Sequence, residues 1–143
     1  MSVRLLRREA SGPEILVHMP KRVLVADDEE MIRELFEAVV RLAGYEPKIE
    51  IDGAKALEAA EDPDIALAIL DLHMPGMGGI ATFQGIKQKR PDLPVMITTG
   101  YGAGDTVKKA MSMGAIGFLQ KPFPIALAIR EIKKVLEGAV RPS

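Results

Sequence analysis

The strongest constraint on the fold is an uninterrupted apolar run over residues 65–70, which is followed directly by Asp71 and by a turn rich in proline and glycine. A short apolar run bounded by turn residues is typical of a strand that is buried on both faces of a sheet. Asp71 is therefore expected where this strand leaves the sheet. A carboxylate fixed at that rim suits a nucleophile or a metal ligand, although an aspartate there can also simply begin a turn.

Short β-rich runs alternate with amphipathic segments along the chain. The expected strands are residues 22–26, 47–51, 65–70, 95–99 and 115–119. The expected helices are residues 29–43, 54–60, 79–89, a segment capped by Asp105 that ends by Gly114, and residues 125–137. Strands separated by helical crossovers pair in parallel, so we predict a three-layer α/β fold with a doubly wound sheet of five strands and five helices.

Polar residues gather where the predicted strands end. They are Asp27, Asp28, Asp71, Thr99 and Lys121. Each has an ordinary explanation by itself, such as capping of the first helix by one of the paired aspartates. Ligands of doubly wound sheets bind outside the carboxyl ends of the strands, so we expect the five side chains to share one site. Three close carboxylates repel one another, and a hard divalent cation such as Mg²⁺ (or Mn²⁺) relieves that repulsion.

This set of groups suits phosphoryl transfer, which depends mainly on positioning and on charge neutralisation. Asp71 is the candidate nucleophile, because an aspartate carboxylate can carry a phosphoryl group covalently. The Thr99 hydroxyl, the Lys121 ammonium and a bound Mg²⁺ would suit the three oxygens of an aspartyl phosphate.

The composition excludes several other classes of protein. A length of 143 residues fits one domain, and the absence of cysteine excludes disulfides and thiolate chemistry. A formal net charge of -1 gives no footprint for nucleic acid or for an anionic membrane. No apolar run approaches the roughly 20 residues of a membrane span. The N-terminus lacks the apolar core of a signal peptide, so we expect a cytoplasmic protein.

Four motifs in chain order make the sequence similar to the receiver domain of two-component response regulators, of the kind found in chemotaxis regulators. They are VLVADDE at 23–29, LDLHMPGMGG at 70–79, VMITTG at 95–100 and GAIGFLQKPF at 114–123. The resemblance implies a flavodoxin-like sheet with strand order 2-1-3-4-5. It places a receiver domain at 21–138, which leaves a tail at 139–143. Residues 1–20 begin with a basic run and contain a Ser-Gly-Pro breaker, so we expect them to form an N-terminal extension that is flexible and has little structure of its own.

The resemblance also implies the roles of the acidic residues. Asp71 would accept a phosphoryl group from a phosphohistidine on a sensor histidine kinase or a histidine phosphotransfer protein. Asp27, Asp28 and Asp71 would hold Mg²⁺ together with the backbone carbonyl of His73. The chain would then act on itself alone, catalysing its own phosphorylation and dephosphorylation, and would not be an enzyme for other substrates.

Further roles follow from the same resemblance. Thr99 and Lys121 would bind the phosphoryl group, with Thr98 as a competing hydroxyl that lies one residue earlier. Phe118 matches the aromatic residue that changes rotamer on activation. The bond between Lys121 and Pro122 is expected to be cis.

Two positions that tune phosphoryl lifetime in the family hold His73 and Tyr101 here. Both side chains are bulky, so we expect them to hinder the attacking water and to lengthen the lifetime of the aspartyl phosphate.

The expected output is contact with a protein through the face formed by the fourth helix, the fifth strand and the fifth helix. No helix-turn-helix or basic recognition helix is present in the sequence pattern, so we expect no direct contact with nucleic acid or membrane. The alternatives are a phosphorelay intermediate and a constitutive pseudo-receiver that serves as a binding module. A hydrolase of the haloacid dehalogenase type would need a second aspartate where His73 stands. The cognate kinase, and whether the chain forms a homodimer, stay open.

Overall fold

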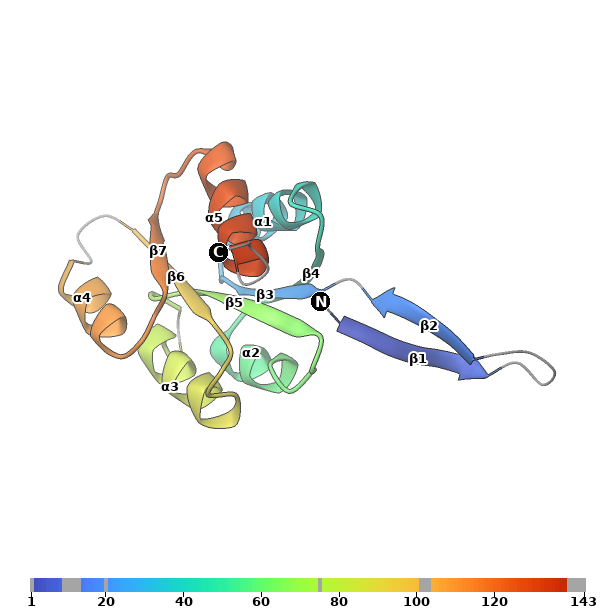
Figure 1. Cartoon of the computed structure of the whole chain (residues 1–143). Helices are drawn as coiled ribbons and strands as arrows, with labels where there is room; N and C mark the ends of the chain where they lie inside the picture. The colour runs from blue at the N-terminus through green and yellow to red at the C-terminus, as the bar shows by residue number, and fades with distance from the viewer. Residues whose placement is uncertain (1, 9–13, 20, 75, 101–103, 139–143) are drawn as a thin grey trace.

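The structure is a computed structural model that describes residues 2–8, 14–19, 21–74, 76–100 and 104–138. A parallel sheet lies between two layers of helices (Figure 1). Its strands are β3 (Arg22–Ala26), β4 (Glu46–Glu50), β5 (Ile65–Asp71), β6 (Val95–Thr99) and β7 (Gly117–Gln120), in the spatial order β4-β3-β5-β6-β7. Its helices are α1 (Glu30–Leu42), α2 (Gly53–Ala59), α3 (Gly79–Lys89), α4 (Gly104–Ser112) and α5 (Ile125–Gly138). Numbered within this sheet, the strand order is 2-1-3-4-5, which confirms the predicted fold.

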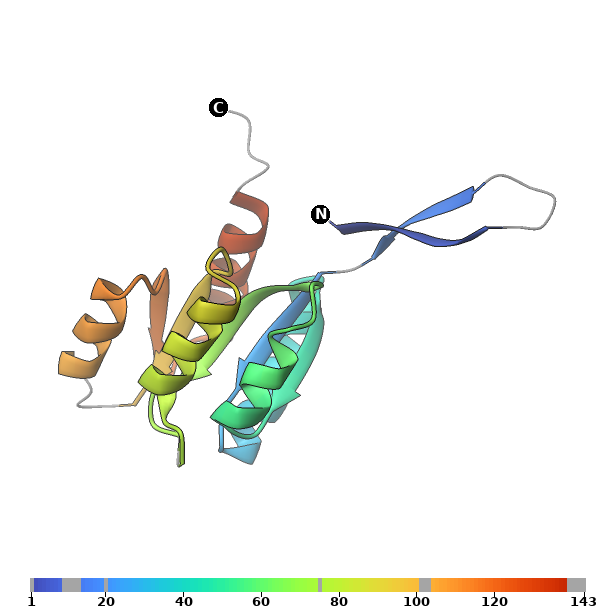
Figure 2. The same cartoon turned by 90° about the horizontal axis from the view of Figure 1, so that it is seen from below.

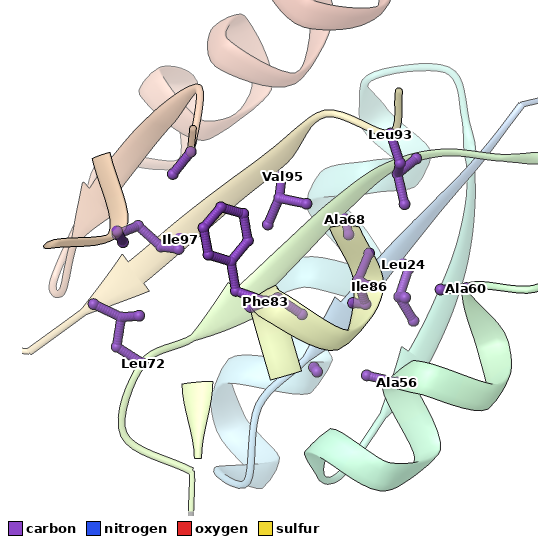
Figure 3. Close-up of a cluster of buried hydrophobic side chains, with 14 of the residues drawn as sticks. Leu24, Ala56, Ala60, Ala68, Leu72, Phe83, Ile86, Leu93, Val95 and Ile97 are labelled. Atoms are coloured by element: carbon purple, nitrogen blue, oxygen red, sulfur yellow. The ribbon is translucent and has the colours of Figure 1, made fainter. Parts of the chain in front are cut away.

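The apolar run of β5 supplies both hydrophobic layers, because successive side chains of a strand point to opposite faces. Ile69 belongs to the layer beneath α1 and α5, where Phe36 is fully buried. Leu70 belongs to the opposite layer, where α3 contributes Phe83 and α2 contributes small side chains (Figure 3). Full burial of each such side chain contributes roughly 1.5–3 kcal/mol. The two layers therefore fix β5 at the centre of the sheet and set the position of the aspartate that ends it.

The helices and strands begin and end within two residues of their predicted positions. The largest difference is at β7, which begins at Gly117, whereas the sequence predicted a strand from residue 115. Ladder pairing decides this limit, since β7 pairs with β6 only from Gly117 onward and Ala115 still bonds back to the end of α4. Of the residues described, no helix is both long and apolar enough to cross a membrane.

The N-terminal segment differs from the expectation of little structure. β1 (Ser2–Arg8) and β2 (Glu14–Met19) pair as an antiparallel ribbon with a bulge between Leu5 and Arg7. The ribbon projects from the sheet in both views (Figures 1 and 2). Two β-rich runs separated by a short segment can pair at a small cost in loop entropy. A two-stranded hairpin by itself is only marginally stable in water, and the flexibility of this extension relative to the domain stays a prediction.

Candidate functional site

The carboxyl edge of the sheet brings the predicted acidic residues together. Asp27 follows β3 and Asp71 ends β5, and both side chains are almost fully buried, whereas Asp28 is exposed. Glu29, which the sequence analysis did not assign to the site, joins them. Ligand oxygens of these four residues all lie within 4.8 Å of one another. The fold thus builds a dense cluster of carboxylates at the point where α/β sheets bind ligands.

The two buried aspartates are held in the same way. The backbone N–H of Glu29 donates to Asp27 Oδ1 at 2.9 Å, and the N–H of His73 donates to Asp71 Oδ1 at 3.0 Å. Each carboxylate therefore closes a turn on the residue two positions ahead, as aspartates commonly do. The second oxygen of each side chain is left to face the interior of the site. Asp71 does close a turn, but it uses only one oxygen for this, so the turn-forming explanation does not exclude a functional role for the other oxygen.

Lys121 reaches into this cluster from the end of β7. Its Nζ lies 2.8 Å from Asp27 Oδ2, 2.9 Å from Glu29 Oε1 and 3.3 Å from Asp71 Oδ2. Burial by itself would lower the pKa of Lys121, but the hydrogen bonds to Asp27 and Glu29 and the neighbouring negative charges raise it overall. The ammonium is therefore charged throughout the physiological range.

A single ammonium does not balance the charge of the site. Burial raises the pKa of Asp27 above its usual range, even though Lys121 and the N–H of Glu29 act to lower it. The contacts with Lys121 and with the N–H of Glu29 thus do not fully offset the cost of burying a charged Asp27. The atoms available as metal ligands are carboxylate oxygens, and Mg²⁺ favours oxygen ligands. The residues present therefore fit a hard divalent cation.

Two cavities lie at this end of the sheet, and one of them adjoins the acidic cluster. The smaller one, of about 250 Å³, is lined by Asp28, Glu29, Asp71, His73, Gly100 and Lys121. The larger one, of about 580 Å³, lies between α4, β6 and β7. Thr99, Gly100 and Phe118 all line the larger cavity, and the Phe118 side chain is about half exposed. Because Gly100 borders both cavities, the end of β6 connects the acidic site to the α4 side of the sheet.

The two threonines at the end of β6 lie in different surroundings. The Thr99 hydroxyl donates to the carbonyl of Gly100 at 3.1 Å, between the two cavities. Thr98 pairs with Asp71 in the parallel register, and its buried hydroxyl has no hydrogen-bond partner within the described part of the chain. Tyr101, a predicted lifetime-tuning residue, lies outside the described residues.

Comparison with known proteins agrees with this geometry. The family model of the response regulator receiver domain matches residues 23–133. This chain belongs to that family. A putative response regulator, NtrX-like, of Rickettsia bellii is 35% identical over 103 residues, which cover 71% of this chain and 22% of the relative. The DNA-binding transcriptional regulator NtrC of Escherichia coli is 37% identical over 116 residues, which cover 80% of this chain and 24% of the relative.

The receiver domain of NtrX from Brucella abortus gives a TM-score of 0.76 at 34% sequence identity, covering 80% of this chain and 98% of that domain. This likeness confirms the receiver fold at the level of the whole domain. The chain spans about a quarter of the length of the NtrX-like and NtrC relatives. The functions of those longer proteins are therefore not assigned to this chain.

Two details of the receiver domain bear on the sequence analysis. The Lys121–Pro122 bond is cis, as predicted. The first helix has Glu29 at its N-cap with no side-chain cap, so neither of the paired aspartates caps it, and the capping alternative is wrong. The acidic run at residues 27–30 signalled a charged loop, but it did not show which glutamate contacts Lys121, because that depends on where β7 ends.

Proposed function

We propose that this receiver domain is a phosphorylation-operated switch that takes a phosphoryl group onto Asp71. The observation that carries the proposal is the position of this carboxylate, which ends the central strand with Oδ1 bound to an N–H and Oδ2 beside the Lys121 ammonium. A nucleophile so fixed has little orientational freedom left to lose, and that is a major part of catalysis by positioning.

The proposed donor is a phosphohistidine of a sensor histidine kinase or of a histidine phosphotransfer protein. An oxygen of Asp71 bonds to phosphorus while the phosphorus–nitrogen bond of the donor breaks. The electron pair stays on the imidazole nitrogen, which then takes up a proton. Lys121 stabilises the charge on the transferred oxygens, as a cation does in other phosphoryl transfers.

The metal ligands proposed are Asp27, Asp28, Asp71 and the backbone carbonyl of His73. A Mg²⁺ ion bound there would neutralise charge between the carboxylates and the incoming phosphoryl oxygens. Asp27 and Asp71 orient their oxygens through the N–H bonds described above, and Asp28 extends the set toward solvent. The proposed role of these residues is to lower the repulsion that a phosphoryl dianion would otherwise meet.

The proposed switch runs from Thr99 to Phe118. The Thr99 hydroxyl now bonds to the neighbouring carbonyl, and it would turn to the phosphoryl group once that group is present. The large cavity beside it gives the half-exposed ring of Phe118 room to move inward. Large apolar side chains are exposed over α4, β7 and the start of α5: Met111, Ile116, Phe118 and Ile125. Such a patch suits a protein partner, and repacking of Phe118 would change it.

The lifetime of the aspartyl phosphate is proposed to depend on the bulk beside Asp71. His73 is exposed and lines the small cavity with Asp71, so its bulk would hinder a water that approaches through that cavity. The same role is proposed for Tyr101 on grounds of sequence alone.

The test is the mass of the intact protein after incubation with acetyl phosphate, with and without Mg²⁺. We expect a Mg²⁺-dependent gain of one phosphoryl group in the wild type and in Asp92→Asn, which removes an exposed aspartate away from the site. Asp71→Asn should show no gain. A gain that survives in Asp71→Asn would place the chemistry elsewhere, and no gain in any variant would favour the constitutive binding module.

A further inference from the structure

Glu29 occupies the N-cap position of α1, with an extended backbone at φ -92° and ψ 121°. Its side chain does not bond to the free N–H groups of the first turn. Short polar residues are strongly preferred at this position because they can make that bond. The longer glutamate side chain is instead directed to the Lys121 ammonium, with Oε1 2.9 Å from Nζ.

Both ends of this ion pair are anchored by the backbone. The N–H of Glu29 is held by Asp27 Oδ1, and the N–H of Lys121 donates to the carbonyl of Thr99 at 2.7 Å. The Glu29 side chain is 59% exposed and the Lys121 side chain is 13% exposed. The ammonium therefore lies between two buried aspartates on the inside and one glutamate on the solvent side. Anchoring lowers the entropy cost that makes most exposed ion pairs weak.

We propose that Glu29 is a positioning residue that holds Lys121 in the acidic site before phosphorylation and competes with the phosphoryl group for it. This inference rests on the proposed function of the site. The Glu29 oxygen is close enough to the aspartates to be a metal ligand as well. The role of Glu29 as a tether that holds Lys121 is favoured over a role as a metal ligand, because the Glu29 oxygen already contacts Nζ at hydrogen-bond distance from the outer side of the site.

Phosphorylation increases the negative charge that the Lys121 ammonium must neutralise. When acetyl phosphate reacts, an Asp71 oxygen bonds to phosphorus, the bond from phosphorus to the acetate oxygen breaks, and acetate leaves with the electron pair. The carboxylate, with one negative charge, becomes an acyl phosphate with close to two. Lys121 must then bind the phosphoryl oxygens, while Glu29 attracts the ammonium outward and repels the incoming dianion. Neutralising Glu29 should therefore make phosphorylation faster.

The experiment compares Glu29→Gln with Glu30→Gln in the full chain. Glu30 is the next residue, is exposed and belongs to the same helix turn, and no described residue forms an ion pair with it. The two variants lose the same charge at nearly the same place, so they differ mainly in the contact with Lys121. The phosphorylation rate with acetyl phosphate should rise about 2–5-fold in Glu29→Gln relative to Glu30→Gln, the range expected for one exposed ion pair.

Two readouts do not depend on phosphorylation. The lysine ammonium signal of Lys121 in ¹H–¹⁵N spectra should exchange faster with water in Glu29→Gln, and it should match the wild type in Glu30→Gln. The Mg²⁺ dissociation constants of the two variants, measured by calorimetry, should agree within about twofold, since a tether contributes only its charge to metal binding.

Equal phosphorylation rates in the two variants would overturn the tether. A much larger loss of Mg²⁺ affinity in Glu29→Gln than in Glu30→Gln would also overturn it, by making Glu29 a metal ligand. If the wild type takes up no phosphoryl group, the proposed function fails. The exchange of the Lys121 signal then still decides whether Glu29 holds the lysine.

Discussion

Lys121→Met is the change whose effect on stability follows most directly from this site. It removes the ammonium and keeps most of the aliphatic side chain. Asp27 and Asp71, which are 1% and 2% exposed, then lose their cationic partner. Loss of one partner from a buried ion pair costs about 3–5 kcal/mol. The Lys121 side chain is 13% exposed and adjoins a water-accessible cavity, so hydration should reduce the cost to about 1.5–3 kcal/mol.

The free energy of unfolding should be measured by urea denaturation in the presence of a metal chelator and again with saturating Mg²⁺. A cation that binds only the folded state stabilises it, and the variant presents a more negative site. We therefore expect Mg²⁺ to recover more than half of the loss. Lys134→Met is the control, because Lys134 is exposed on α5 and should cost no more than about 0.5 kcal/mol.

Two results would refute this reasoning. A loss below about 0.5 kcal/mol in the chelated protein would mean that the carboxylates are already hydrated or protonated. A full loss that Mg²⁺ leaves unchanged would mean that the cluster does not bind a divalent cation.

Two further predictions concern the packing of α3 and the titration of a tyrosine. A Cβ on Gly79 would press on the backbone at the end of β5, so Gly79→Ala should lower the free energy of unfolding by about 1–3 kcal/mol and slow phosphorylation. In Gly117→Ala the added Cβ meets open space, so this control should have neither effect. Calorimetric unfolding and intact mass measure the two effects, and equal effects in both variants would contradict the prediction. Burial, and then the hydrogen bond to Glu137, raise the pKa of Tyr45 to about 12, so stability should fall as the pH rises from 10 toward 12, where the unfolded state loses the proton first. Ultraviolet titration with the other tyrosine replaced by phenylalanine should show that raised pKa, and Glu137→Gln should lower it; a pKa near 10 in both would contradict the contact.

Much of the fold could be predicted because its signals are local. The apolar run that ends at Asp71 predicted a strand buried on both faces, and β5 contributes to both hydrophobic layers. The alternation of strands and helices predicted parallel pairing with all strand ends at one edge. That topology is enough to bring Asp27, Asp71 and Lys121 to the same region. The first residue of β7 was harder to predict from the sequence, because pairing with β6 decides where this strand begins.

The details of the site depend on contacts between distant parts of the chain. Glu29 and Lys121 are 92 positions apart, and nothing in the acidic run at residues 27–30 shows which glutamate meets the lysine. The surroundings of Thr98 and Thr99 likewise follow from the face of β6 on which each lies. The amino-acid sequence by itself determined the order of the strands and helices along the chain, because short-range periodicity predicts each element. It also determined which polar residues stand at the ends of the strands. Only the tertiary structure decided how one ammonium is shared among three carboxylates, because charge pairs form in space and not along the chain.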